Sequence, residues 1–397
     1  MRRRRLILLI ASLPVMAIAA PPAQRGGVTP APDPVEERIR AGAAKLYDTS
    51  VLHVIDIVIP PEDTAKIVRR TEERIRCTFT FDGRTLTNVG VRQAGGIFHG
   101  YVPIEGKPSL SLKFDEFVKG QRLFDLDKLI LKNELQDLGL VNEHLTYEVF
   151  RRAGLAASLT AHARVTINGI DAGIYLLREP IDKDFLVRNF GKGHETGNLY
   201  EIENLQEFVF QPTAPKLDDE GKNGRTRDDL VRFAKAIAAT RPESFVNDLG
   251  PMLDIDRFVT YVAAEIATRH WDGFSGNNNN TYVYAHPKDG RFIFIPYGAD
   301  QTLGVSRGPR GGSFMPGRSV LARKLLEVPA LAERVRQEVA RIGREPVWNV
   351  KTLLERLYQV GRILPTDVQG GRIRADVSRY LAYRSTMEAA IQAGGAQ

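Results

Sequence analysis

The feature that most restricts the fold of this chain is a pair of apolar runs that flank Asn168-Gly169. The runs span Ala163 to Ile167 and Gly173 to Leu177. Asn-Gly favours the positive φ angles of a tight two-residue turn, so this stretch predicts a β-hairpin. An antiparallel pair of this kind buries one face, and the chain must supply further elements to cover it.

Other alternating runs precede this hairpin. We expect strands at Val51 to Ile59, Thr78 to Phe81, Leu86 to Arg92 and Lys107 to Phe114. Asp82-Gly83 joins the second and third of them and predicts another tight turn. Polar residues from Glu62 to Arg70 predict a helix after the first strand. The amino-terminal half is therefore expected to form a small antiparallel sheet.

Helical patterns dominate the rest of the chain. Asn142 to Ala153 predicts a helix that ends at Gly154, and Asp256 to His270 keeps one apolar face at helical spacing. Two short strands, Thr281 to Tyr284 and Phe292 to Ile295, follow, and amphipathic helices are expected from Leu321 to Ile391. Strands, one helix, strands and then helices predict an α+β fold, with a small antiparallel-sheet lobe and a larger, mainly helical lobe.

The first residues predict export. Arg2 to Arg5 precede an apolar run that ends in Ala17-Ile18-Ala19, which is typical of a secretory signal peptide over residues 1–19. An uncleaved membrane anchor is the alternative, but the run is short and contains Pro14. Residues 20–48 are expected to form a linker with a short helix. After cleavage no integral membrane span is expected, and the protein would be periplasmic or extracellular.

Composition argues against two classes of function. Four of the charges in the formal net charge of +7 belong to the leader, which leaves +3, and no basic stripe is interleaved with aromatic residues, so nucleic-acid binding is not expected. The single cysteine, Cys77, cannot form an internal disulfide and lies in an alternating stretch, where a small apolar strand residue is favoured over a catalytic thiol.

Four blocks in a fixed order resemble the spore-coat CotH family. They are Val89-Gly90-Val91-Arg92 with Lys107-Pro108-Ser109-Leu110-Ser111-Leu112-Lys113-Phe114; Asn142-Glu143-His144-Leu145 through Gly154; Ile167-Asn168-Gly169 with Gly173 to Glu179; and Asp272 to Tyr282 with Ile295 to Gly304. Each block alone is a weak signal, whereas their order and spacing together cover about two thirds of the chain. The resemblance assigns residues 49–304 to a kinase-like domain and leaves 305–397 as a helical extension packed on the second lobe.

The resemblance implies an atypical protein-kinase-like fold that binds ATP with Mg²⁺ or Mn²⁺ and phosphorylates Ser or Thr of partner proteins. Phosphoryl transfer needs a lysine on the phosphates, an acid that orients it, a base at the nucleophile and metal ligands. The expected nucleotide-binding residues are Arg92, Lys107, Lys113, Glu143 and Glu179. Asp272 and Asp300 are the expected catalytic residues, and Asp300, Asn278 and Asn280 the expected metal ligands, because hard cations prefer oxygen ligands.

Each candidate also has a structural interpretation. Either strand lysine would suit a solvated sheet edge, and Glu143 would complement the dipole of the helix that it begins. Arg92 would suit a structural ion pair as well as a phosphate contact, and the asparagine run is also typical of a flexible polar loop. His270, beside Asp272, is interpreted as an orienting or solvated side chain rather than a general base.

One position departs from the family pattern. The family usually has Pro-Trp-Asp-x-Asp where this chain has Pro296-Tyr297-Gly298-Ala299-Asp300, so Gly298 replaces the first acid. This leaves a second hypothesis open: a catalytically silent kinase-like module that binds a protein, a nucleotide or a component of the cell envelope. A glycoside hydrolase with paired carboxylates fits less well, because the acids follow the kinase-like order and the chain has only two Trp residues for stacking on sugars.

Overall fold

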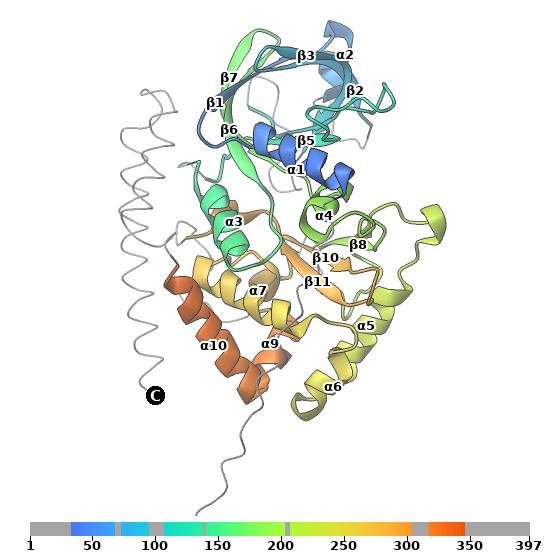
Figure 1. Ribbon diagram of the computed structural model, residues 1–397, viewed down its shortest axis with the longest axis vertical. Coiled ribbons are helices and arrows are strands. Elements are labelled where there is room, and N and C mark those ends of the chain that lie inside the picture. Colours follow the sequence, from blue (N-terminus) through green and yellow to red (C-terminus); the bar gives the residue numbers. More distant parts are fainter. Residues whose placement is uncertain are drawn as a thin grey trace, which may run out of the picture. The chain divides into compact units, whose positions relative to one another are not determined.

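Seven strands close into a barrel in the amino-terminal lobe of the computed structural model, which describes residues 33–67, 73–94, 107–137, 140–202, 207–303 and 317–345 (Figure 1). The strands are β1 (Leu52–Val58), β2 (Ile75–Phe81), β3 (Arg84–Gln93), β4 (Leu110–Lys113), β5 (Lys128–Lys132), β6 (Thr160–Ile167) and β7 (Ile170–Arg178). Around the barrel they run in the order β1-β2-β3-β4-β5-β7-β6.

The closed barrel corrects the expectation of a small antiparallel sheet. Strand β1 pairs antiparallel with β2 on one side and parallel with β6 on the other, from Leu52 opposite His162 to Ile57 opposite Ile167. The parallel pair joins segments about a hundred residues apart, and no local turn signal encodes such a pairing. Both predicted hairpins are confirmed, and Asn168 has the positive φ of 50° that its turn requires.

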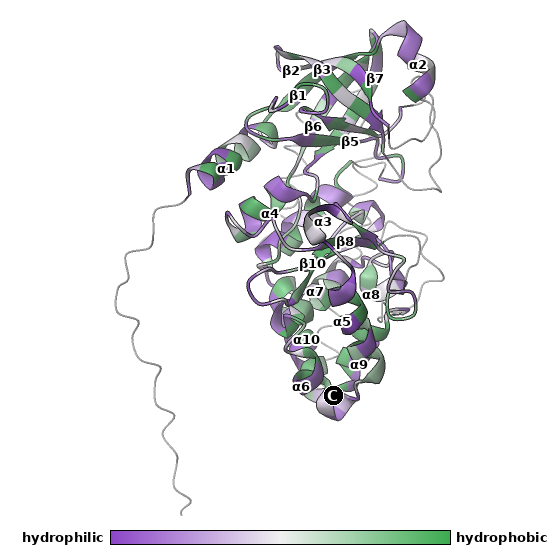
Figure 2. Ribbon diagram, turned by 90° about the vertical axis from the view of Figure 1, so that its right-hand side faces the viewer, coloured by the Kyte–Doolittle hydropathy of each residue, from purple (hydrophilic) through white to green (hydrophobic). Residues whose placement is uncertain are grey.

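Alternation along the strands separates side chains of the apolar barrel core from side chains that point out of the barrel. Leu112 on β4 and Leu131 on β5 are fully buried in the barrel core. The alternate positions point the other way, and there Ser111 lies opposite Ile130 and Lys113 opposite Lys128. Figure 2 shows hydrophilic and hydrophobic residues interspersed along the barrel strands.

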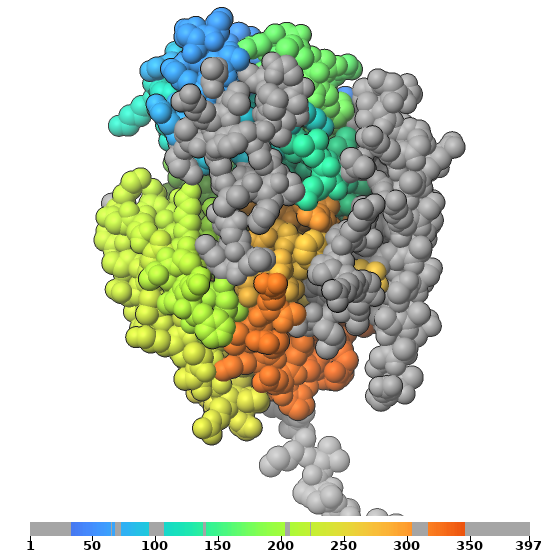
Figure 3. All heavy atoms as spheres, turned by 180° about the vertical axis from the view of Figure 1, so that it is seen from behind, coloured from blue at the N-terminus to red at the C-terminus, as the bar shows by residue number. Residues whose placement is uncertain are grey.

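The second lobe is built around a small sheet and a set of helices. Its strands, in the order β11-β10-β8-β9, are β8 (Leu199–Ile202), β9 (Lys216–Leu217), β10 (Thr281–Ala285) and β11 (Phe292–Pro296). Its helices are α5 (Asp228–Ala239), α6 (Phe245–Leu249), α7 (Ile255–Thr268), α8 (Phe274–Asn277), α9 (Val320–Glu327) and α10 (Pro329–Gly343). In the space-filling view from behind, barrel residues and second-lobe residues occupy opposite ends (Figure 3).

Two helices connect the lobes. Helix α3 (Asn142–Arg152) lies between β5 and β6 in sequence, and its residues Leu145 and Phe150 belong to the core of the second lobe. Helix α4 (Lys183–Phe190) follows β7 directly, so the chain passes from barrel to second lobe at residues 179–182. Helices α1 (Pro34–Leu46) and α2 (Pro61–Ile67) accompany the barrel strands.

The second core is aromatic. Phe258 lies 4.7 Å from Phe294 between ring centroids, and Phe274 lies at the same distance from Phe294 on another side. This packing holds α7 and α8, which precede and follow the Asp272 loop, against β11. Among the described residues, no helix combines the length and hydropathy that crossing a bilayer needs. The segment predicted as a signal peptide lies outside the described residues.

Candidate functional site

The site centres on a lysine and an aspartate from opposite lobes. Lys132, the last residue of β5, places Nζ 3.7 Å from Asp300 Oδ2, and both side chains are largely buried. Asp300 lies in a short 3-10 helix (Ala299–Gln301) directly after β11. Asn142, the first residue of α3, donates a side-chain hydrogen bond to the Asp300 carbonyl oxygen at 3.3 Å. Three elements from distant parts of the sequence therefore meet at Asp300.

The charge of each member of this pair opposes the effect of burial on the pKa of the other. Burial lowers the pKa of Lys132, but the nearby charges of Asp300 and Glu143 outweigh it, so that the pKa is raised overall. Burial raises the pKa of Asp300, while the Lys132 charge acts in the opposite direction. Removing Lys132 would leave Asp300 buried without this compensation.

Glu143 pairs with an arginine instead of a strand lysine. Arg178, at the end of β7, donates to Glu143 Oε1 at 2.9 Å, and the Tyr147 hydroxyl donates to the same oxygen at 2.7 Å. Arg178 also donates to the Tyr297 hydroxyl at 2.6 Å and stacks over that ring at 4.1 Å. Burial would raise the pKa of Glu143, but Arg178 and Lys132 together lower it to about 2. Glu143 is thus an ionised acid that ties α3 to the junction of the two lobes.

Asp272 is held by side-chain amides of the asparagine run. Its carboxylate accepts hydrogen bonds from Asn277 at 2.6 Å, from Asn279 at 3.2 Å and from Asn280 at 3.0 Å. These bonds orient the carboxylate and show that the run is an organised turn around an acid. Asp272 itself remains half-buried.

A buried glutamate of α7 supports the same loop. Glu265 accepts hydrogen bonds from the backbone N–H groups of Phe274 and Ser275, both at 2.9 Å, and from the Tyr261 hydroxyl at 2.9 Å. Its side chain is fully buried, and burial raises its pKa despite these donors. Glu265 therefore holds the backbone of the loop that carries Asp272. Sequence reasoning did not identify this second acid.

Asn280 connects the Asp272 loop to the Asp300 turn. Its amide group donates to Asp272, and its side-chain oxygen lies where a Cβ atom at position 298 would be placed. Gly298 has a φ of 52°, a left-handed conformation that side chains disfavour. The Asn280 side chain therefore occupies the space that a side chain at position 298 would need. The Asn278 side chain instead forms a hydrogen bond with Glu207.

The other predicted site residues do not reach Asp300 in the described contacts. Lys113 pairs with Glu116 at 2.8 Å. Glu179 pairs with Arg188 at 2.6 Å and accepts a hydrogen bond from the backbone of Leu159.

The contacts given for Lys107 and Arg92 are with residues other than Asp300. Lys107 places Nζ 5.2 Å from the Tyr175 ring centre, and burial lowers its pKa. Arg92, half-buried on β3, is opposite Ser111 in the strand register. Lys132 is thus the strand lysine that lies beside Asp300, and sequence reasoning did not select it. The signal was present: Leu129-Ile130-Leu131 is a short apolar run between Lys128 and Lys132, and such runs are typical of buried strands.

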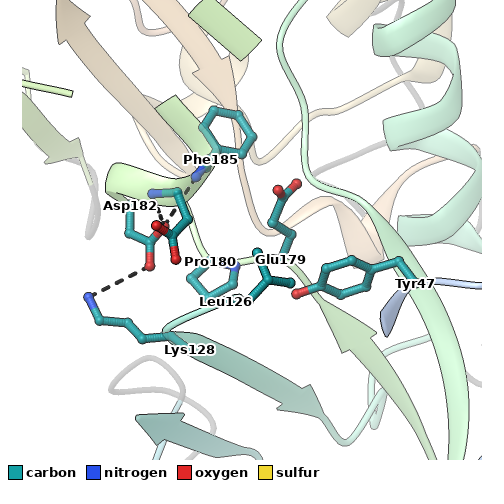
Figure 4. Close-up of a pocket in the computed structure, with 8 residues that line it drawn as sticks. Tyr47, Leu126, Lys128, Glu179, Pro180, Asp182 and Phe185 are labelled. Carbon is teal, nitrogen blue, oxygen red and sulfur yellow. Dashed lines mark hydrogen bonds and ion pairs between the residues drawn. The ribbon is translucent and has the colours of Figure 1, made fainter. Parts of the chain in front are cut away.

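A small polar cavity lies where the chain passes between the lobes (Figure 4). Its volume is about 10 Å³, which is room for one water molecule, and it is lined by Tyr47, Leu126, Lys128, Glu179, Pro180, Asp182, Asp184 and Phe185. Asp182 lies 3.8 Å from Lys128 and caps α4 by accepting from two backbone N–H groups. Burial raises the pKa of Asp182 to about 7, against the effect of Lys128.

The oxygen donors at Asp300 suit Mg²⁺ or Mn²⁺ only if a bound nucleotide adds its phosphate oxygens. Among the described residues there is no cluster of three His, Cys, Asp or Glu side chains that would hold a metal ion. Mg²⁺ in nucleotide sites is commonly held by one or two carboxylates together with substrate phosphates. Asp300, with one carboxylate at a polar boundary between the lobes, suits that arrangement.

Comparisons with known proteins agree on a family. Residues 99–358 match the family described as CotH kinase protein. Inner spore coat protein H of Bacillus subtilis (strain 168) is 25% identical over 183 residues, 44% of this chain and 49% of that protein. Invasin CotH2 of Rhizopus delemar (strain RA 99-880) is 23% identical over 266 residues, 61% of this chain and 45% of that protein. The chain spans about half the length of the curated relatives that it matches.

Two solved structures align at low scores. The Helicobacter pylori proinflammatory kinase CtkA aligns over 71% of this chain and 90% of its own, with 10% identity and a TM-score of 0.33. Shewanella oneidensis MR-1 HipA, solved with HipB and operator DNA, aligns over 93% of this chain and 73% of its own, with 12% identity and a TM-score of 0.35. The family match covers more than half of the sequence, and this chain therefore belongs to the CotH kinase family.

Proposed function

We propose that this protein is an exported kinase-like phosphotransferase that moves the γ-phosphate of ATP to Ser or Thr of a partner protein. The observation that carries the proposal is the Lys132–Asp300 pair at the boundary of the lobes, linked through Asn280 to the carboxylate of Asp272. A cation, an acid beside it and a second, oriented acid are the groups that phosphoryl transfer requires of a protein.

The roles of these residues follow from their surroundings. Lys132 would contact phosphate oxygens, and Asp300 would hold a divalent cation together with those phosphates. That cation would neutralise charge on the transferred group. Asp272 would accept the proton of the attacking Ser or Thr hydroxyl. The hydroxyl oxygen would then bond to the γ-phosphorus as the bond between that phosphorus and the ADP oxygen breaks. The asparagine amides would keep the Asp272 carboxylate aimed at the hydroxyl.

Gly298 favours a second candidate function. With Gly298 in the place of an acid, the turn from Pro296 to Asp300 offers a single carboxylate to a cation. A protein with this site would bind nucleotide weakly and would serve as a silent kinase-like module that binds an envelope protein. The two functions differ in turnover, which is therefore the quantity to measure.

An exported or surface location is part of the proposal. Two relatives carry names that describe a spore coat protein and an invasin, and the amino-terminal residues have the composition of a signal peptide. Mass spectrometry of the native protein is expected to find an amino terminus near Ala20. An intact Met1 end would contradict export by this route.

The direct test of turnover uses labelled ATP, Mn²⁺ or Mg²⁺ and a Ser/Thr-rich protein substrate. Wild-type protein is expected to transfer label, and Asp272→Asn to lose about 10²–10⁴-fold in rate while retaining ATP affinity, because Asn keeps the size but cannot accept the proton. Transfer that survives this substitution would refute the role of Asp272. Binding without any transfer by the wild type would establish the silent module.

A further inference from the structure

One buried acid beside the site has no partner. Glu134 is 2% exposed, and within the described part of the chain neither of its carboxylate oxygens has a hydrogen-bond donor. Buried carboxylates are ordinarily paired or hydrogen-bonded, because an isolated buried charge is strongly unfavourable. An orphaned acid therefore calls for a functional explanation.

The backbone holds Glu134 firmly in this position. Its φ is 54°, a left-handed conformation that a non-glycine residue adopts at a cost. The preceding residue, Asn133, donates from its side chain to the Lys107 carbonyl oxygen and from its backbone to Ser109 Oγ, both at 3.0 Å. On the other side, Asp137 donates its backbone N–H to the Glu134 carbonyl oxygen at 3.2 Å. These bonds fix the turn that follows β5 and leave the Glu134 side chain inside it.

The charges around Glu134 are mostly of its own sign. Three acids act on it, Glu143, Asp137 and Asp300, against the nearby cation Lys132, and together with burial they raise its pKa well above the ordinary range. Lys107 is a further cation within range of Glu134, but its ammonium lies over the Tyr175 ring. The ligand-free protein thus keeps an acid in surroundings that disfavour its charge.

Lys132 is the cation that can pair with Glu134 and compensate its charge. Its ion pair among the described residues is with Asp300, and a divalent cation on Asp300 would repel the ammonium group. Glu143 already accepts from Arg178 and Tyr147 through Oε1, and only its Oε2 lacks a donor among the described residues. Glu134, two residues after Lys132, has both oxygens available.

We propose that Glu134 is the positioning residue that receives the Lys132 ammonium when Asp300 binds a divalent cation with nucleotide. The inference rests on the proposed function. It assigns to Glu134, after β5, the task of orienting the phosphate-binding lysine, and it leaves Glu143 to join α3 to Arg178. Glu134 then acts through Lys132 and does not touch the nucleotide.

The test compares Glu134→Gln with wild type, and with Glu148→Gln as the matched control. Glu148 is a buried acid of α3 that pairs with Arg152 at 2.9 Å. Thermal unfolding is measured from pH 5 to pH 8.5 without ligand, and calorimetry measures affinity for ATP with Mn²⁺. Glu134→Gln is expected to match the thermal stability of the wild type at pH 5, to exceed it at pH 8.5 and to bind ATP with Mn²⁺ at least tenfold more weakly. The control is expected to bind normally.

The sign of the pH effect follows from proton linkage. The pKa of Glu134 is higher in the folded state than in the unfolded chain, so wild-type stability falls as pH rises above the unfolded value, and the neutral glutamine removes that loss. A purely structural acid would give the opposite result, because its removal would lower stability. Destabilisation by Glu134→Gln, or unchanged affinity in this variant, would overturn the inference. A wild type that binds no nucleotide would instead contradict the proposed function, and the inference with it.

Discussion

The Lys132 ammonium lies 3.7 Å from the Asp300 carboxylate, and this pair joins the end of a barrel strand to a turn of the second lobe. Both groups are largely removed from water, so their interaction is stronger than that of a surface ion pair, and each depends on the other for charge compensation. The pair also links the two lobes. A ligand that binds Asp300 would therefore change the contact between them.

Gly298→Ala is expected to destabilise the protein. A side chain in the left-handed region costs about 1–2 kcal/mol, and here the added Cβ would also overlap the Asn280 side chain. Gly83→Ala is the matched control, because Gly83 has a φ of 82° with no atom near the position of the added Cβ. Urea unfolding should show a larger loss for Gly298→Ala than for the control. In an Asn280→Ala background the difference should shrink; equal losses at both glycines would contradict the packing described for Asn280.

Glu265→Ala is expected to weaken the loop that carries Asp272. The substitution leaves the buried N–H groups of Phe274 and Ser275 without an acceptor, at about 1–3 kcal/mol for each group. Glu265→Gln retains one side-chain oxygen and should lose less stability. Chemical denaturation measures both losses, and label transfer should fall in the same order. A Gln variant as unstable as the Ala variant would show that the charge, and not the acceptor, supports the loop.

Asp182→Asn is expected to change how stability depends on pH. Burial raises the pKa of Asp182 to about 7, so the folded state binds a proton that the unfolded chain releases between about pH 4 and pH 7, and wild-type stability falls as pH rises through this range. Asparagine still caps α4 but does not titrate. The charged neighbours Lys128, Asp184 and Glu179 remain. Unfolding midpoints at pH 4, 5.5 and 7 should fall less steeply in the variant, and parallel curves would refute the assignment.

The sequence contained the local parts of the fold but not the long-range ones. Asn168-Gly169 and Asp82-Gly83 predicted their hairpins correctly, because the positive φ angles of such turns depend on a few adjacent residues. Closure of the barrel depends on the parallel pairing of β1 with β6, which no nearby residue specifies. The α+β class was therefore predictable, whereas the barrel was not.

The candidate site shows the same division. Asp272 and the asparagine run were selected from their loop, and the structure does bring Asn280 and Asp272 together. The partner of Asp300 was not selected, because the choice of Lys107 or Lys113 followed from a block of resemblance, while Lys132 lies in a strand that was not predicted. Glu134 could not be selected from the sequence either, since an unpaired acid is recognised only when its burial and hydrogen bonds are known.

The central claim is that Lys132 and Asp300 form the nucleotide site, and calorimetry of ATP binding with Mn²⁺ tests it most directly. Wild-type protein is expected to bind, and Lys132→Met to bind at least tenfold more weakly, because the variant loses the cation that would contact phosphate. Lys113→Met is the control, since Lys113 is engaged by Glu116 at 2.8 Å, and its affinity should equal that of the wild type. Equal affinity of Lys132→Met and wild type, or a loss confined to Lys113→Met, would contradict the account.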